Sequence, residues 1–499
     1  MRTKRNVLSL LVASMLLAWT AAAAAGENAN NELPAALESP ANETQVAAPE
    51  SAAEGSPATL ESAAEEATPP DGGSDMDLLG WAKRQGGYFG WLGREIEMVG
   101  GMDLYGVTSQ LPKGYMSAKY QWTTIRAGKR YNNKRALGPV MQPIAFTAPD
   151  GSEVLNIDLG LQGYGGGHTF QFSYGITDPL DYYIELPFTY MNVKFKPKMA
   201  AIKGADGKTY TDKDGNTYKI HPDWAPLLGI KDPLNYDECN FMYETLPALG
   251  RPAPATTYIG KWMMGDINTG FSWNPFRTNR MSVALTPRVF LPTGHQPNAN
   301  NNLLYGTGPE LETGIGGWAA GATQGYDFRI FKYKYWLNVL FSSEFTATYA
   351  FEQQRKYPTN FPKPSPTAQQ LDAQSFPDLS NLEGTFRYTP GWSVDWTAQL
   401  QIQLAVIGLG IGYGITHSQE PELMADPAFT SMVKGLELLG QQTTQAVMFA
   451  GSLSLLPLFI PADLGVQYAH VVDGYNAIVM DDYWQVTVKG YIPVKLLWE

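Results

Sequence analysis

The 499-residue chain has little of what most catalytic and redox proteins use. Cys239 is its single cysteine, so no disulfide forms within the chain. Gly-x-Ser-x-Gly, a Walker-type phosphate loop and Cys-x-x-Cys-His are all absent. No pair among its five histidines has metal-ligand spacing (His168, His221, His295, His417 and His470). These absences predict that the protein is not an enzyme and holds no metal or other cofactor.

Charge and hydropathy exclude further classes. Charged residues make up only 17% of the chain, and acidic residues outnumber basic ones by 48 to 36. That excess disfavours nucleic acid and anionic membrane surfaces as partners. Beyond the first 25 residues, no run of about 20 apolar residues occurs, so no membrane-spanning helix is expected there.

The N-terminal residues have the pattern of a secretory signal. Arg2, Lys4 and Arg5 precede the apolar stretch Val7–Trp19, and the small residues Ala21–Ala25 follow it. The alternative, an uncleaved membrane anchor, is disfavoured because the apolar stretch is short for a spanning helix. We therefore predict a signal peptide over residues 1–25 and an exported protein.

Two further segments precede the first predicted strand. Residues 26–75 are rich in Ala, Glu, Pro and Ser, contain no Lys or Arg, and are predicted to be disordered. Residues 76–112 are predicted to form a short plug in, or a periplasmic cap on, the β-barrel that the strands after them indicate, and to limit flux through it. An amphipathic helix at the membrane interface is the alternative. The plug prediction depends on an aromatic cluster consisting of Trp81, Tyr88, Phe89 and Trp91.

From Tyr115 onward, apolar and polar residues alternate. Phe170, Phe172, Tyr174 and Ile176 are separated by Thr, Gln, Ser and Gly, a period of two that is typical of a strand between two media. A soluble sandwich also alternates, but its strands are usually about five or six residues long. Longer runs, together with 27 Tyr, 13 Trp and 50 Gly, indicate an all-β antiparallel transmembrane barrel over residues 113–499.

Short turns and long polar connections can be arranged in strict alternation, which gives about twelve strands. Because that number is even, both chain termini are expected on the periplasmic side. The long connections include 196–260, 417–442 and 473–482. Two predicted strands, 154–176 and 392–416, change parity and are interpreted as single strands with a bulge; if one is a hairpin, the count becomes fourteen. The predicted strands are 115–126, 154–176, 181–195, 261–273, 281–291, 309–319, 328–351, 382–389, 392–416, 443–455, 462–472 and 483–495.

Polar residues of these strands that alternate with apolar ones are expected to line the lumen. They are mostly acidic, which predicts a preference for cations or neutral solutes over anions. The competing interpretation is that these charges pair across the lumen and only fill the barrel. The candidates are Asp158, Glu185, Asp266, Arg288, Glu310, Glu312 and Asp395.

Two other motifs have simpler explanations than ligand binding. Asp212, Asp214 and Asn216 match part of a calcium loop, but the distal Glu is missing and Asp-Gly turns in a surface hairpin explain the pattern better. The alternating glycines of 408–414 are interpreted as small residues on one strand face that leave room inside the barrel, rather than as a nucleotide-binding loop.

Two segments resemble a known family. Phe172–Asp178, and Pro287–Gly294 (Pro-Arg-Val-Phe-Leu-Pro-Thr-Gly) followed by Gly306–Leu311, resemble elements of the outer-membrane transporter family named for the MetA pathway of phenol degradation. The resemblance extends from about residue 150 to the C-terminus. It implies an outer-membrane barrel that takes up hydrophobic or aromatic compounds, and it implies no catalytic residues.

The expected function is thus an outer-membrane pore or transporter for passive passage of small, hydrophobic or aromatic compounds. Expected partners are outer-membrane lipid, the barrel-assembly machinery that reads a C-terminal strand such as Trp484–Ile492, an unidentified small solute, and a periplasmic or surface protein. The alternative is a structural barrel that sheathes or anchors a surface or electron-transfer complex, which the long loops and acidic tail would suit.

Overall fold

The structure is a computed structural model. It describes residues 106–494 apart from 142, 149, 254–256, 304–307, 309, 334–336, 367–376, 436–439 and 459. The predicted signal peptide, the predicted tail and the plug candidates Trp81, Tyr88, Phe89 and Trp91 lie outside these residues. No helix in the described part of the chain is long and apolar enough to cross a membrane.

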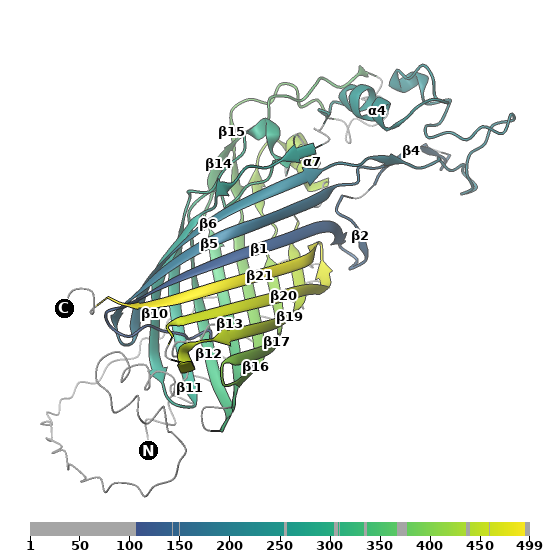
Figure 1. The fold of residues 1–499 in the computed structure, drawn as a ribbon. Coiled ribbons are helices and arrows are strands. Elements are labelled where there is room, and N and C mark those ends of the chain that lie inside the picture. The colour runs from purple at the N-terminus through teal and green to yellow at the C-terminus, as the bar shows by residue number, and fades with distance from the viewer. Residues whose placement is uncertain are drawn as a thin grey trace, which may run out of the picture. The chain divides into compact units, whose positions relative to one another are not determined.

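Twelve long antiparallel strands form a closed barrel (Figure 1). The ring closes because β6 pairs with both β5 and β10, and because the first and last strands are neighbours, from Tyr115 beside Pro493 to Arg130 beside Ile478. The strands are β1 (Tyr115–Tyr131), β5 (Gln162–Thr177), β6 (Leu180–Lys194), β10 (Ile267–Arg277), β11 (Met281–Leu291), β12 (Ala319–Tyr333), β13 (Leu337–Ala350), β16 (Gly391–Leu404), β17 (Ile407–Ser418), β19 (Gln442–Ser454), β20 (Ala462–Tyr475) and β21 (Ile478–Pro493).

The alternation in the sequence separates the two faces of the barrel wall. Leu400 and Ile402 on β16 are exposed and pair with the exposed Ile411 and Leu409 on β17. At the positions that alternate with such exposed residues, the side chains are polar, and Lys119 on β1 interacts electrostatically with Glu344 on β13. Since β1 and β13 lie on opposite sides of the ring, only inward-pointing side chains can approach in this way. The apolar face is therefore outside, and the polar face lines the lumen.

The two ends of the barrel differ in their connections. At the short-turn end, strands are joined by short segments such as 178–179, 278–280 and 405–406, and β1 begins and β21 ends there. At the long-loop end the connections are long, except for a tight turn at residues 476–477 between β20 and β21. That turn corrects the predicted loop 473–482, most of which is strand.

The predicted count of twelve strands is confirmed, although five predicted strands were placed wrongly. In the predicted strand 309–319, residues 310–318 form no barrel strand and Ala319 begins β12, and 382–389 contains β15 (Thr385–Thr389) of a separate sheet. Conversely, 328–351 and 392–416 each contain parts of two strands, so the errors cancel. In 392–416 the parity changes at a hairpin turn, where Ala405 adopts a positive φ of 50° without any Gly, Asn or Pro to signal it.

The predicted strand 154–176 also needs correction. It contains two elements rather than one bulged strand, because β4 (Glu153–Asp158) pairs outside the barrel and β5 begins only at Gln162.

Two small folded units at the long-loop end are built from the long connections. In the first, β4 pairs with β3 (Ile144–Thr147) and β7 (Lys198–Met199), around a core in which Leu155, Ile157, Ile220 and Phe241 are fully buried. The 196–260 connection supplies much of this unit. Its helical turns are η1 (Pro226–Leu228), α4 (Glu238–Asn240), η2 (Phe241–Thr245, a π-helix) and α5 (Leu246–Ala248).

In the second unit, β15 pairs with β14 (Gln353–Lys356) and β18 (Glu422–Met424), and α7 (Pro427–Gly435) packs on them through Phe429 and Val433 (Figure 1). Both folded units thus have apolar cores of their own. The remaining short elements are β2 (Leu137–Pro139), β8 (Thr257–Ile259), β9 (Met263–Met264), η3 (Ala299–Asn301) and η5 (Leu456–Leu458).

Candidate functional site in the barrel lumen

Four charged side chains lie near enough in the lumen to interact electrostatically. Lys119 on β1 interacts electrostatically with Glu185 on β6 and with Glu344 on β13. Arg288 on β11 interacts with both of these carboxylates. All four side chains are half-buried, so each keeps part of its surface accessible. Two cations and two carboxylates offset each other, and we call this group the central charge cluster.

The sequence had singled out two members of the cluster, Glu185 and Arg288, and the structure brings them together. Lys119 and Glu344 were missed. The alternation could have identified both, because neighbouring residues of a strand point to opposite faces. Lys119 directly precedes the outward Tyr120, and Glu344 directly precedes the outward Phe345.

The other predicted lumen residues are spread out. Asp395 on β16 has the same parity as the inward Gln399. Asp266 precedes β10 at the long-loop end and is buried. Glu310 and Glu312 lie in the connection between β11 and β12. Asp158 lies on β4, outside the barrel wall, so its predicted place on a barrel strand was wrong.

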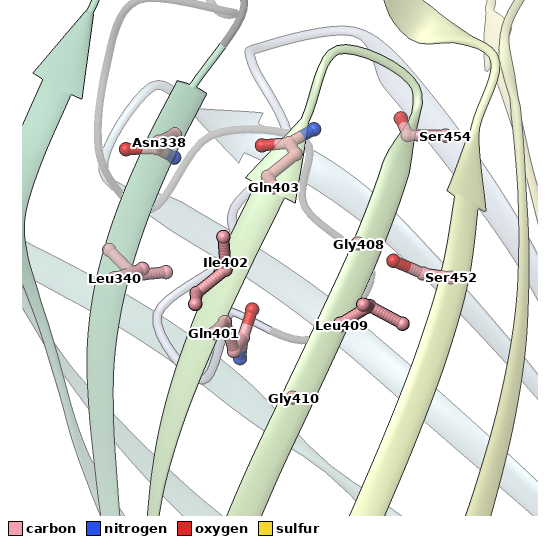
Figure 2. Close-up of a pocket in the computed structure, with 10 residues that line it drawn as sticks. All are labelled: Asn338, Leu340, Gln401, Ile402, Gln403, Gly408, Leu409, Gly410, Ser452 and Ser454. Atoms are coloured by element: carbon pink, nitrogen blue, oxygen red, sulfur yellow. The ribbon is translucent and has the colours of Figure 1, made fainter.

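A neutral wall occupies another part of the lumen. On β16, Gln399, Gln401 and Gln403 pair with the glycines at positions 412, 410 and 408 of β17. Near the short-turn end this surface forms a pocket (Figure 2), which is lined by Asn338, Leu340, Gln401, Ile402, Gln403, Gly408, Leu409, Gly410, Ser452 and Ser454. The prediction that these glycines leave room on one strand face fits this arrangement.

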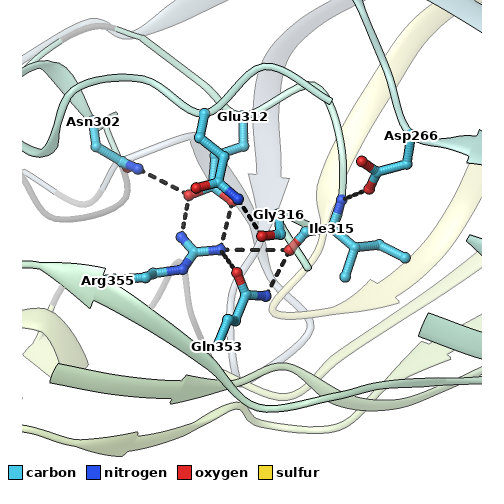
Figure 3. Close-up of polar contacts among 8 residues, drawn as sticks. Asp266, Asn302, Glu312, Ile315, Gly316, Gln353 and Arg355 are labelled. Carbon is cyan, nitrogen blue, oxygen red and sulfur yellow. Dashed lines mark hydrogen bonds and ion pairs between the residues drawn. The ribbon is translucent and has the colours of Figure 1, made fainter. Parts of the chain in front are cut away.

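A buried ion pair fixes the connection between β11 and β12 to the second folded unit (Figure 3). The guanidinium of Arg355 on β14 donates through both terminal nitrogens to the Glu312 carboxylate and lies 4.2 Å from the ring centre of Tyr388. Asn302 Nδ2 also donates to Glu312, at 3.0 Å. Burial raises the pKa of the Tyr388 phenol to about 12, so the ring stays neutral beside the cation.

Asp266 organises the glycine-rich stretch of the same connection. Its carboxylate accepts hydrogen bonds from two backbone N–H groups, that of Gly294 at 2.8 Å and that of Ile315. Figure 3 shows the second of these. A Cβ on Gly314 would overlap this carboxylate, so a larger residue there would displace Asp266 from these hydrogen bonds. Asp266 therefore serves to hold a loop over the long-loop end.

The Asp-Gly tandem outside the barrel forms turns stabilised by Asp212. The Oδ1 atom of Asp212 accepts from the backbone N–H groups of Asp214 (2.9 Å) and Asn216 (2.8 Å), and Oδ2 accepts from the Tyr218 hydroxyl (2.8 Å). Thr211 and Thr217 bridge as an antiparallel pair, as the surface-hairpin interpretation requires. Over the described residues, no group of three or more His, Cys, Asp or Glu side chains is placed to hold a metal ion.

No protein-family model matches the chain, and no curated protein matches it. Among solved structures, an outer membrane channel from Pseudomonas putida F1 is similar, with a TM-score of 0.41, 10% identity, and coverage of 77% of this chain and 97% of that one. The beta domain of the Bordetella autotransporter Brka has a TM-score of 0.32 and 8% identity, and the match covers 76% of this chain and 99% of that one. The CymD monoaromatic hydrocarbon channel has a TM-score of 0.26 and 10% identity, with coverage of 79% of this chain and 91% of that one. The barrel architecture described above rests on its own strand pairing rather than on these similarities.

The Arg355–Glu312 pair generates a first prediction. Arg355→Ala leaves a nearly buried carboxylate without its cation, which typically costs about 3–5 kcal/mol. We expect residues 310–318 and β14 to lose hydrogen-exchange protection by a corresponding amount. The matched control is Arg387→Ala, which breaks an exposed pair with Glu352 and should cost about 0–1 kcal/mol. Equal effects of the two substitutions would contradict the assigned role.

The Asp212 turn generates a pH prediction. Hydrogen bonds from the Asn216 side chain, the Asn216 backbone and Tyr218 lower the Asp212 pKa from 3.8 to about 2. Because the pKa is depressed in the folded state, the stabilisation is present above about pH 4 and is lost as the pH falls through about 2. Hydrogen exchange of residues 209–218, corrected for intrinsic rates, should show this loss. Asp212→Asn should remove the pH dependence, and its persistence in that variant would refute the assignment to Asp212.

Proposed function

We propose that the protein is an outer-membrane pore through which small solutes pass passively. The observation that carries the proposal is the closed barrel with an apolar outer face and a polar, partly accessible inner face. Large apolar side chains such as Leu409, Ile411 and Phe449 are about half exposed on the outer face. Covering each of them with lipid contributes roughly 1.5–3 kcal/mol, whereas a water-soluble barrel would leave a continuous apolar surface in solvent.

Exposed aromatic residues support the same placement. Tyr174, Tyr182 and Trp273 lie near the short-turn end of the wall, and Trp392 and Tyr164 lie toward the long-loop end. Two such bands around an apolar belt are typical of a barrel in a bilayer, with aromatic rings at both interfaces. By the same rule, short turns face the periplasm and long loops face outward.

The lumen favours small neutral solutes. The central charge cluster combines Lys119 and Arg288 with Glu185 and Glu344, so its charges largely cancel. The neutral wall of glutamine amides and glycines offers hydrogen bonds without a net field. We further propose that these solutes include hydrophobic or aromatic compounds, as the family resemblance implies.

The purified protein tests the proposal in planar bilayers and in liposome swelling. We expect ion conductance, and swelling with neutral sugars that slows as the sugar grows. A neutral aryl glycoside that enters faster than a sugar of similar size would support the aromatic preference. A folded barrel that neither conducts nor causes swelling would contradict the pore, and a haem protein that co-purifies with it would favour the sheath alternative.

The neutral wall predicts a steric effect at Gly410. A Cβ there meets only ordinary contacts, so a larger residue fits the backbone and projects into the lumen. We expect Gly410→Phe to slow sugar-driven swelling by about threefold or more, because pore width controls passage. The control is Gly451→Phe, since Gly451 pairs with the outward Leu409 and nothing lies within 4 Å of its Cβ position. Equal slowing in both variants would refute a path along this wall.

The central charge cluster predicts opposite shifts in ion selectivity. Glu185→Gln leaves an excess of positive charge in the lumen and should raise anion over cation permeability by a few-fold, on the order of 2–5. Lys119→Gln should shift the reversal potential the other way under the same salt gradient. If both substitutions move the potential in one direction, the cluster does not line the conducting path.

A further inference from the structure

Residues 106–114, which we call the inner strap, lie inside the barrel before β1 begins. Asp327 on β12 holds one part of the strap. Its carboxylate accepts hydrogen bonds from the backbone N–H groups of Val107 (3.3 Å) and Thr108 (2.8 Å) and from the Thr108 hydroxyl. Asp327 is 0% exposed and Thr108 is 1% exposed. This part of the strap is therefore fixed against the lumen wall by a fully buried carboxylate.

Other wall strands hold the rest of the strap. Asn274 Nδ2 on β10 donates to the Thr108 carbonyl at 3.1 Å. Gln110, which is 1% exposed, donates through Nε2 to the Ser272 carbonyl at 3.1 Å. The backbone N–H of Leu111 donates to Asp181 Oδ2 on β6 at 2.7 Å. These contacts come from three wall strands, β6, β10 and β12, and all bind a single short segment.

The wall is shaped to accept the strap. A Cβ on Gly325 of β12 would lie 3.0 Å from the Val107 carbonyl oxygen, and one on Gly175 of β5 would overlap the Pro112 carbonyl. Glycine at both positions lets the two backbones approach closely. The strap is thus matched to the barrel both in hydrogen bonds and in shape.

The strap occupies the short-turn end of the lumen. Asp181 directly follows the turn between β5 and β6, and Asn274 lies close to the end of β10. From β21, on the opposite side of the ring from β12, Lys489 reaches the strap and its Nζ lies 3.3 Å from Ser109 Oγ. The strap and Lys489 together bridge the lumen.

We propose that the inner strap is a constriction that limits flux at the short-turn end and that its release from Asp181 and Asp327 widens the pore. The inference goes beyond the proposed function, and its effect on flux rests on the chain being a pore. The strap's position can be tested independently of conductance. It overlaps the C-terminal part of the predicted plug, residues 76–112, of which the structure describes only 106–112.

A disulfide tests the position of the strap. A Cβ on Gly325 would lie 3.2 Å from Cγ2 of Val107, within reach of a disulfide between these positions. It would also lie 3.0 Å from the Val107 carbonyl oxygen, which a shift of the strap by a few tenths of an ångström relieves. Val107→Cys and Gly325→Cys are combined with Cys239→Ser, so that only one pair of thiols exists. Oxidation of the folded protein should cross-link the pair, as judged by mass spectrometry of linked peptides. A folded barrel that does not cross-link overturns the placement, whether or not it conducts.

Conductance then tests the effect on flux. Asp181→Ala and Asp327→Ala are added to the cysteine pair. The oxidised form should conduct like the wild type, and reduction should raise single-channel conductance by about twofold or more as the strap is released. The control adds Asp395→Ala to the cysteine pair in place of the other two substitutions, and so removes an inward carboxylate toward the long-loop end. Reduction of this variant should leave its conductance unchanged. Equal conductance of the oxidised and reduced forms overturns the gating role.

A second variant covers the case in which loss of two buried carboxylates prevents folding. Thr108→Gly with Gln110→Gly weakens the strap from its own side and leaves the wall unchanged. The same dependence on the redox state of the cysteine pair is expected. Conductance that is absent from the wild type and from every variant would refute the pore itself, whereas the cross-link would still report the position of the strap.

Discussion

The constraint on which the structure depends is closure of the sheet. Because β1 pairs with β21 and β6 pairs with β10, no barrel strand is left as a free edge with unpaired backbone N–H and C=O groups. In a bilayer such groups have no water to bind, so a sheet must close to cross it. Once the ring is closed, the two-residue period of each strand sends alternate side chains to the outer face and to the lumen.

Closure also explains why residues far apart in the sequence act together. Lys119 and Glu344 interact electrostatically because their strands face each other across the lumen, and Lys489 on β21 reaches Ser109 of the strap that β12 holds from the opposite side of the ring. The resulting lumen has unlike regions. One carries the charge cluster and the bound strap, and the other is the wall of Gln399, Gln401 and Gln403 opposite glycines. The proposed route for neutral solutes follows the second region.

Residue alternation was sufficient to predict the barrel, whereas the strand number was right because errors in placing individual strands cancelled. Alternation failed where the deciding contact was not local. The turn at Ala405 has no turn-forming residue, and it forms because β16 and β17 pair along their whole length. Asp158 alternates like a barrel residue, yet it belongs to a sheet whose core is supplied by the 196–260 connection. The contacts of Asp327 with the strap join residues more than 200 positions apart, which no local pattern reveals.

The central claim is that one face of the wall meets lipid and the other meets water. Single cysteines at Leu409, Gly410, Ile411 and Gly414 of β17, in a Cys239→Ser background and a reconstituted bilayer, test it most directly. The account predicts that a membrane-impermeant thiol reagent labels positions 410 and 414, while a lipid-dissolved quencher reaches fluorophores only at 409 and 411. Uniform labelling along the strand, or the opposite parity, would contradict it.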